Sequence, residues 1–289
     1  FMHLVNHRKA QEALIRTPSG LPGEPDHAAA QRVIYAARAD GRTALTDPET
    51  RAVLRAYGVP VLESQEATTP RQAGEAAHRF GGSVALKILS PDITHKSDIG
   101  GVALGLEGAE ETEREAGAML ARIAKARPEA RLTGLVVEPL VDRPMAQELL
   151  VGFARDPLFG PVVTFGAGGV GVEIIADRVI GLPPLDDVLS QDMISRTRIW
   201  RMLRGYRDHP PADLGAIVDV LTRVSQIAVE HPEIAELDVN PLLADADGVL
   251  ALDARMSLAP ADAPAPRMAI LPYPERLHRE AKLGDVKIT

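Results

Sequence analysis

Apolar residues recur along this chain at two different spacings, which together predict a mixture of strands and amphipathic helices. Short β-branched runs bounded by glycine or proline favour strands. Such runs lie over residues 59–62, 84–88, 101–106, 132–138, 145–151, 162–165, 172–175, 237–243 and 249–253. Apolar positions three or four residues apart favour helices. That spacing lies over residues 46–58, 69–81, 110–126, 185–203 and 214–224, after an alanine-rich helix that ends near residue 41. The interleaved order predicts an α+β fold.

Residues at the expected ends of these elements support the same boundaries. Thr46 precedes Pro48 and Glu49, so a capping side chain, an early proline and an acid near the positive end of the helix dipole fall in one turn. Gly58 is placed to end that helix. Farther along, the Asp-Ala-Asp-Gly sequence at 245–248 predicts the turn of a β-hairpin.

Composition excludes several classes of protein. With 289 residues, 45% of them hydrophobic and 25% charged, the chain can form a sizeable core in one large domain or two lobes. The net charge of −8 and the 3% aromatic content argue against nucleic acid as a partner. The absence of cysteine excludes disulfides, thiolate metal sites and cysteine nucleophiles. No apolar run reaches the roughly 18 residues of a membrane helix and the first residues do not form a signal peptide, so we expect a cytoplasmic protein with no membrane partner.

A glycine-rich segment is one candidate for nucleotide chemistry. Residues 166–171, Gly-Ala-Gly-Gly-Val-Gly, follow a predicted strand and match the GxGxxG pattern of dinucleotide-binding folds. That function needs a helix to begin in the loop, whereas the β-branched residues that follow lead into Pro183 and predict two short strands. A dinucleotide-dependent oxidoreductase is therefore the weaker hypothesis, and we expect this glycine loop to have a different use.

A lysine-bearing strand and the loop after it form a second candidate. Lys87 lies in a predicted strand, and the following loop carries His95, Lys96 and Ser97 before two glycines. Successive backbone N–H groups at glycines bind anions closely, and the lysines and the hydroxyl add to that capacity. On these residues alone an ordinary exposed turn is an equally good interpretation, and a lone histidine is more often structural than catalytic.

Carboxylate and amide side chains supply possible ligands elsewhere. The predicted hairpin would bring Asn240 beside Asp253 on paired strands, and oxygen ligands of this kind suit Mg²⁺ together with substrate phosphates. Glu138 and Glu148 lie on apolar strands, where a carboxylate can accept from a ribose hydroxyl or an adenine amino group. Each feature also has a plain structural interpretation, as turn residues or as solvated side chains. Combined with Lys87, they indicate a Mg²⁺–nucleotide site.

The order of these pieces is more specific than any one of them. The chain resembles the ATP-grasp domain of NDP-forming acyl-CoA synthetases, relatives of the β-subunit of succinyl-CoA synthetase. The segments that carry the resemblance are LRAYGVPV (54–61), ALKILSPDITHKSDIGGVALGL (85–106), QELLVGFARDPLFGPVVTFGAGG (147–169), ELDVNPLL (236–243) and ALDARM (251–256). The resemblance covers roughly residues 45–256 and implies the ATP-grasp fold, in which two α/β lobes hold a nucleotide between them.

The resemblance also implies roles for individual residues. The residues implied to lie around the phosphates of ATP are Lys87, Lys96, Ser97, Gly168 and Gly169. His95 falls where some of these synthetases have a histidine proposed to carry phosphate in transit. The residues implied to hold adenine, ribose and Mg²⁺ are Glu138 and Val141 at a hinge, Glu148 at the ribose, and Asn240 and Asp253 at the metal.

The same resemblance implies partners and boundaries. Residues 1–45 would be a helical lead-in from a preceding CoA-ligase domain, and residues 46–256 the ATP-grasp domain. Residues 257–289 would be a linker toward an acetyltransferase domain, because 267–289 is similar to the segment before that domain in Pat-type bifunctional protein lysine acetyltransferases. The implied function is transfer of phosphate between ATP or ADP and a histidine or acyl phosphate, for acyl-CoA formation with a CoA-binding domain. The alternative is a non-catalytic module of an acetyltransferase that senses nucleotide or acyl-CoA.

Overall fold

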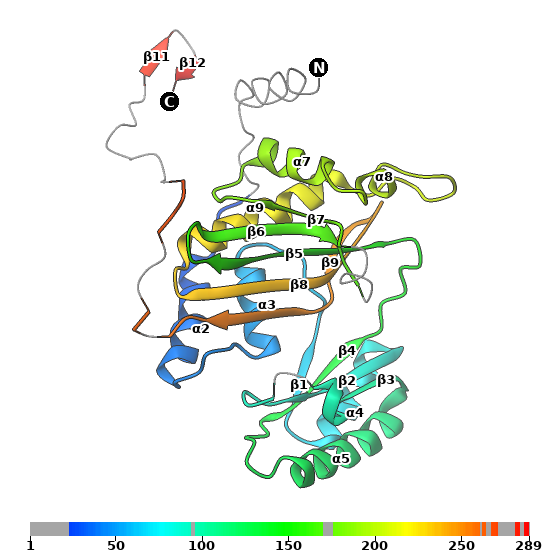
Figure 1. Ribbon diagram of the computed structural model, residues 1–289. Coiled ribbons are helices and arrows are strands. Elements are labelled where there is room, and N and C mark those ends of the chain that lie inside the picture. The colour runs from blue at the N-terminus through cyan, green and yellow to red at the C-terminus, as the bar shows by residue number, and fades with distance from the viewer. Residues whose placement is uncertain are drawn as a thin grey trace.

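The protein has two lobes, each built from one sheet and its helices (Figure 1). The computed structural model describes residues 23–93, 96–169, 176–260, 262–263, 267–270, 281–283 and 286–288. The small lobe comprises residues 63–140. The large lobe comprises residues 23–62 together with the described residues of 141–260.

The small lobe is an antiparallel sheet covered by two helices. Its strands, in spatial order, are β1 (Gln65–Ala67), β4 (Gly134–Pro139), β2 (Ser83–Leu89) and β3 (Val102–Glu107). The helices are α4 (Pro70–Phe80) and α5 (Gly108–Ala126), with the short 3₁₀ helix η1 (Ser97–Ile99) before β3. Met119 and Ile123 of α5 are fully buried against Leu86 and Ile88 of β2 in one core. This packing fixes β2, and therefore Lys87, relative to the rest of the lobe.

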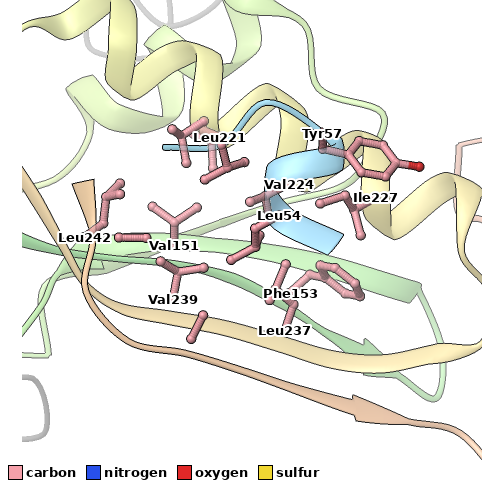
Figure 2. Close-up of a cluster of buried hydrophobic side chains, with 14 of the residues drawn as sticks. Leu54, Tyr57, Val151, Phe153, Leu221, Val224, Ile227, Leu237, Val239 and Leu242 are labelled. Atoms are coloured by element: carbon pink, nitrogen blue, oxygen red, sulfur yellow. The ribbon is translucent and has the colours of Figure 1, made fainter. Parts of the chain in front are cut away.

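The large lobe is a second antiparallel sheet with its own core. Its strands run in the order β10 (Ala254–Leu258), β8 (Ile234–Asp245), β5 (Gln147–Asp156), β6 (Gly160–Ala167) and β7 (Arg178–Gly181), and β9 (Gly248–Ala251) also pairs with β8. The helices are α2 (His27–Ala39), α3 (Asp47–Ala56), α7 (Asp187–Ser195), α8 (Trp200–Leu203) and α9 (Leu214–Glu230). Figure 2 shows Leu54 of α3 and Leu221 of α9 packed over Val151 and Val239 of the sheet.

The two faces of β8 are chemically different because its side chains alternate. Leu237 and Val239 are fully buried in the large-lobe core, whereas Glu236 and Asp238 lie on the other face and line a cleft between the lobes. The sheet therefore presents an acidic face to the small lobe. A short hairpin of β11 (Ala281–Leu283) and β12 (Val286–Ile288) is described farther along the chain.

Most expected elements are confirmed, including the capped start of α3. Glu49 accepts the backbone N–H of Thr46 at 2.8 Å, and Thr69 and Gly81 delimit α4 as predicted. The hairpin of β8 and β9 is confirmed, with Asp245 paired to Gly248. The prediction of an α+β fold is confirmed as well.

Two expectations about elements are wrong, each for a local reason. The strand expected over 59–62 is only an isolated bridge from Val61 to Ala251, because the chain leaves there for the small lobe. The single helix expected over 185–203 is divided into α7 and α8. The Asp177 carboxylate accepts the N–H groups of Arg198 and Ile199 at 2.8 and 2.7 Å, which starts a new helix there.

Three other expectations concern a strand outside the described residues, a domain boundary and membrane-spanning helices. The strand expected over 172–175 lies outside the described residues. The large-lobe core extends across the predicted boundary at residue 45, since α2 contributes the buried Ala30, Ile34 and Ala37. Among the helices of the described ranges, none is both long and apolar enough to span a bilayer.

Candidate functional site

A cleft of about 570 Å³ separates the two lobes, and four of the predicted site residues line it. The small lobe contributes Lys87, Lys96 and Ser97 to its lining. The large lobe contributes mainly acids, with Asp47, Glu236, Asp238 and Asp253 accompanied by Arg255. One wall is therefore cationic and the other mostly anionic, an arrangement suited to a phosphate group bound together with a divalent cation.

Lys87 is held by carboxylates from both lobes. Its ammonium Nζ lies 2.9 Å from Oε2 of Glu138, a residue on the neighbouring strand β4. In the sheet register Glu138 is opposite Ala85, so it is a diagonal neighbour of Lys87 on the same face. The same nitrogen lies 3.9 Å from Oδ1 of Asp253 in the large lobe. Lys87 is thus placed between the lobes, as the sequence hypothesis requires.

Glu138 is buried, with both carboxylate oxygens in ion pairs. Oε1 accepts from Nη2 of Arg51 at 2.6 Å, while Oε2 is paired with Lys87. Burial raises the pKa of the Glu138 carboxyl, and Lys87 and Arg51 oppose that shift. Its role as a reader of adenine stays a prediction, and in this geometry the carboxylate orients Lys87. Val141 lies just beyond β4, in the connection between the lobes.

Asn240 and Asp253 lie side by side, as expected from the predicted hairpin. The backbone N–H of Asn240 donates to the carbonyl oxygen of Asp253 at 3.1 Å, beside the β8–β10 pairing of Val239 with Ala254. The Asp253 carboxylate is partly exposed in the cleft and lies 3.9 Å from Nε of Arg255. Both side chains present hard oxygen donors of the kind that Mg²⁺ prefers.

The glycine loop after β6 joins Asn240 to Glu148. The Gly169 N–H donates to Oδ1 of Asn240 at 2.9 Å, and the Gly168 N–H donates to the backbone oxygen of Glu148 at 2.8 Å. Gly169 has a φ of +78°, and a Cβ there would lie 1.6 Å from Oε2 of Glu148. A side chain at Gly169 is therefore excluded unless Glu148 moves.

The loop after β2 places Lys96 in the cleft. The Gly101 N–H donates to the carbonyl oxygen of Lys96 at 2.7 Å, and a Cβ at Gly101 would lie 2.6 Å from Ile88. Glycine is thus required for the loop to pack on β2. Burial lowers the pKa of the Lys96 ammonium, while the charges of Asp47 and Asp253 oppose that change. Oδ1 of Asp47 is buried and has no hydrogen-bond partner among the described residues.

Several charged residues in or beside the cleft were missed by the sequence analysis. Arg51, Asp47 and Arg255 carry no motif that distinguishes them from other helix or strand charges. Asp238 could have been found, because the period of two along β8 puts it on the face of Asn240. Burial and the nearby Glu236 raise the pKa of the Asp238 carboxyl, and Arg255, opposite it in the register, lowers it.

The remaining predicted residues divide into two groups. Lys87, Lys96, Ser97 and Asp253 line the cleft. Glu148, Gly168, Gly169 and Asn240 are linked by the hydrogen bonds of the glycine loop, and Asn240 meets Asp253 through its backbone N–H. His95, the predicted phosphate carrier, lies outside the described residues. Within the described ranges, no three side chains of the histidine, cysteine, aspartate or glutamate type gather as a complete metal site. A cation held by Asn240 and Asp253 would therefore need phosphate oxygens or water to complete its shell.

Comparison with known sequences gives one family. The ATP-grasp domain family matches residues 36–258. Subunit β of the ADP-forming acetate–CoA ligase I of Pyrococcus furiosus is 36% identical over 231 residues, which are 80% of this chain and 98% of that subunit. The ADP-forming acetate–CoA ligase I of Archaeoglobus fulgidus is 39% identical over 206 residues, 71% of this chain but only 30% of that longer protein.

Comparison with solved structures agrees. Acetyl-coenzyme A synthetase 1 of Ca. Korarchaeum cryptofilum, in complex with coenzyme A and Ca-AMPCP, matches with a TM-score of 0.74 and 35% identity, over 80% of this chain and all of that one. The same synthetase with coenzyme A and Mg-AMPPCP, its phosphohistidine segment pointing towards the nucleotide-binding site, matches with a TM-score of 0.69 and 33% identity.

Proposed function

The chain belongs to the ATP-grasp domain family, and on that premise we propose that its cleft binds Mg·ATP and transfers the γ-phosphoryl group in an NDP-forming acyl-CoA synthetase. The observation that carries the proposal is the meeting of Lys87 with Asp253, 3.9 Å apart, from opposite lobes. A triphosphate between the lobes would contact the lysine on one wall and a bound cation on the other.

The described residues supply the main requirements of phosphoryl transfer. That reaction depends on positioning and on neutralising the phosphate oxygens more than on covalent help from the protein. Lys87 and Lys96 line the cleft from the small lobe, where their ammonium groups would neutralise phosphate oxygens. Asn240 and Asp253 would hold Mg²⁺, which draws electron density from the phosphates when bound.

His95 completes the proposal as the acceptor. The bond between the γ-phosphorus and the β–γ bridging oxygen breaks, a P–N bond forms with an imidazole nitrogen, and ADP leaves. The phosphohistidine would then pass its phosphoryl group on for the synthesis of acyl-CoA. The Korarchaeum complexes, which contain both coenzyme A and a nucleotide analogue, support a partner domain that binds CoA.

Two partners are proposed for this domain, a CoA-binding domain and an acetyltransferase, and only the first is supported by the relatives. A CoA-binding partner is supported by the subunit name of the Pyrococcus relative and by the greater length of the Archaeoglobus one. An attached acetyltransferase stays a prediction from the similarity of residues 267–289. Because the relatives named above are synthetases, the regulatory alternative gains no support from them.

Titration calorimetry with ATP, in the presence and absence of Mg²⁺, tests the binding step. We expect Mg-dependent binding, weakened roughly 10- to 150-fold in Lys87→Met, the loss of one charge-assisted hydrogen bond of about 1.5–3 kcal/mol. Asp253→Ala should reduce the difference between titrations with and without Mg²⁺. Equal affinities in wild type and Lys87→Met would remove the phosphate assignment.

A second experiment tests the transfer step. The chain is mixed with a CoA-binding synthetase domain and γ-labelled ATP, and acid-labile label on protein is measured. We expect labelling that is lost in His95→Ala. Binding of Mg·ATP without any labelled protein would instead favour the non-catalytic alternative.

A further inference from the structure

Arg51 is the most buried cation beside the cleft and has the most partners. Its side chain is only 2% exposed and lies at the middle of α3. Its Nε donates to Asp47 at 3.1 Å, and its Nη2 donates to Glu138 at 2.6 Å. Two backbone carbonyl oxygens, those of Leu62 and Leu252, accept at 2.8 and 3.0 Å. One guanidinium therefore joins a helix, a strand of the other lobe and two connecting segments.

Two of these partners lie where the chain enters and leaves the small lobe, and a third is next to a predicted metal ligand. Leu62 immediately precedes the small lobe, and Glu138 stands near its end. Leu252 is the neighbour of Asp253, the predicted metal ligand that lies 3.9 Å from Lys87. Arg51 thus fixes the two walls of the cleft relative to each other while remaining outside its lining.

The ion pair between Arg51 and Glu138 also affects the electric field at Lys87. One carboxylate is shared by two cations, Arg51 on Oε1 and Lys87 on Oε2. If Arg51 were neutral, Glu138 would be matched by Lys87 alone, and the Asp47 carboxylate would lose its partner. The field at the lysine would become more negative, in surroundings where burial limits screening. If Glu138 were neutral, the field at Lys87 would become more positive.

We propose that Arg51 is a positioning residue for triphosphate binding, because it shares the charge of Glu138 and so leaves Lys87 oriented but only partly neutralised. This inference rests on the proposed function, in which Lys87 contacts phosphate. The inference predicts an effect on ATP affinity that a purely structural role of Arg51 would not produce. Loss of Arg51 and loss of the Glu138 charge both remove buried partners, yet they must change ATP affinity in opposite directions.

The test compares Arg51→Met, Arg51→Lys and Glu138→Gln by Mg·ATP calorimetry below their melting temperatures, with thermal unfolding measured in parallel. We expect Arg51→Met to bind Mg·ATP about tenfold more weakly, which corresponds to about 1.4 kcal/mol. Glu138→Gln removes the charge but keeps an amide oxygen that can accept from Lys87, so it should bind Mg·ATP more tightly than wild type, although both variants melt at lower temperature. Arg51→Lys keeps the charge, so we expect affinity within about threefold of wild type and a lower melting temperature.

Arg55→Met is the matched control. Arg55 lies one turn later on α3, is exposed, and donates to the same Leu62 carbonyl oxygen at 3.3 Å without an ion pair to Glu138. We expect its Mg·ATP affinity to be unchanged. Affinities of Arg51→Met and Glu138→Gln that fall together, or that match Arg55→Met, would overturn the inference. If Arg51→Met does not fold, an Arg51→Lys affinity as low as that of Lys87→Met would overturn it.

The two proposals fail in different ways. Absence of Mg·ATP binding by the wild-type chain, or unchanged binding in Lys87→Met, contradicts the proposed function. Normal dependence on Lys87 without opposed effects of the Arg51 and Glu138 variants contradicts only the positioning role.

Discussion

Replacing Gly169 with alanine separates the conformational requirement of the glycine loop from the contribution of Glu148 to nucleotide binding. Gly169 has a φ of +78°, where an L side chain costs about 1–2 kcal/mol. The new Cβ would also lie 1.6 Å from Oε2 of Glu148 and 3.5 Å from its Cβ. Only the far end of a flexible, exposed side chain must therefore move. We expect the free energy of unfolding to fall by little more than the cost of the positive φ.

Gly81→Ala supplies the matched stability control. Gly81 ends α4 with a φ of +69°, and a Cβ there would meet nothing within 4 Å. Both variants should lower the melting temperature by roughly 2–4 °C for each kcal/mol, and by similar amounts. Only Gly169→Ala displaces Glu148, the predicted ribose ligand. Loss of a hydrogen bond from ribose to this charged group costs about 1.5–3 kcal/mol, or roughly 10- to 150-fold in Kd.

Calorimetry with ATP, 2′-deoxy-ATP and 3′-deoxy-ATP measures that loss directly. We expect the wild type to prefer ATP over at least one deoxy analogue, and Gly169→Ala to bind ATP and that analogue equally. A Gly169→Ala variant that loses only as much stability as Gly81→Ala and keeps wild-type affinity for ATP would refute the reasoning, because Glu148 would then make no contact with the nucleotide.

Two further predictions concern a polar cluster at the C-terminal end of α3, around the capping residue Tyr57. The Tyr57 hydroxyl donates to Glu230 at 2.6 Å and lies 2.8 Å from Nε2 of His231, so Tyr57→Phe should cost about 1–3 kcal/mol in urea unfolding. Mg·ATP affinity should not change, and wild-type stability of this variant would contradict the assignment. Burial lowers the pKa of His231, so the native state binds this proton less readily than the unfolded chain, whose histidines titrate near pH 6.5. We therefore expect the free energy of unfolding to have its full value above about pH 6.5 and to fall at lower pH. Its slope against pH should be smaller in His231→Gln. Equal slopes in urea unfolding of the two proteins would show that another group is responsible.

The parts of the site that depend on local sequence could be predicted. Asn240 and Asp253 meet because a short turn and a period of two determine their register. The capped start of α3 and the glycine end of α4 also follow from neighbouring residues. The order of motifs was sufficient to identify the family.

The contacts between distant segments could not be predicted in this way. Pairing of β2 with β4 brings Glu138 to Lys87, and no property of either residue specifies that strand order. The sequence around Arg51 is that of an ordinary helix-surface arginine. Its partners nevertheless come from three segments far apart along the chain. The expected strand over 59–62 failed for the same reason, since tertiary connectivity overrode a local β-branched pattern.

The small lobe is one uninterrupted insertion, residues 63–140, within a large lobe whose sheet is assembled from segments that follow it in the chain. During synthesis a ribosome therefore releases every residue of the lobe that carries Lys87 well before it reaches β8. Domains generally fold as units from the N-terminal side while translation continues. The basic wall of the nucleotide cleft is thus available to fold in the nascent chain before Asn240 and Asp253 have been polymerised.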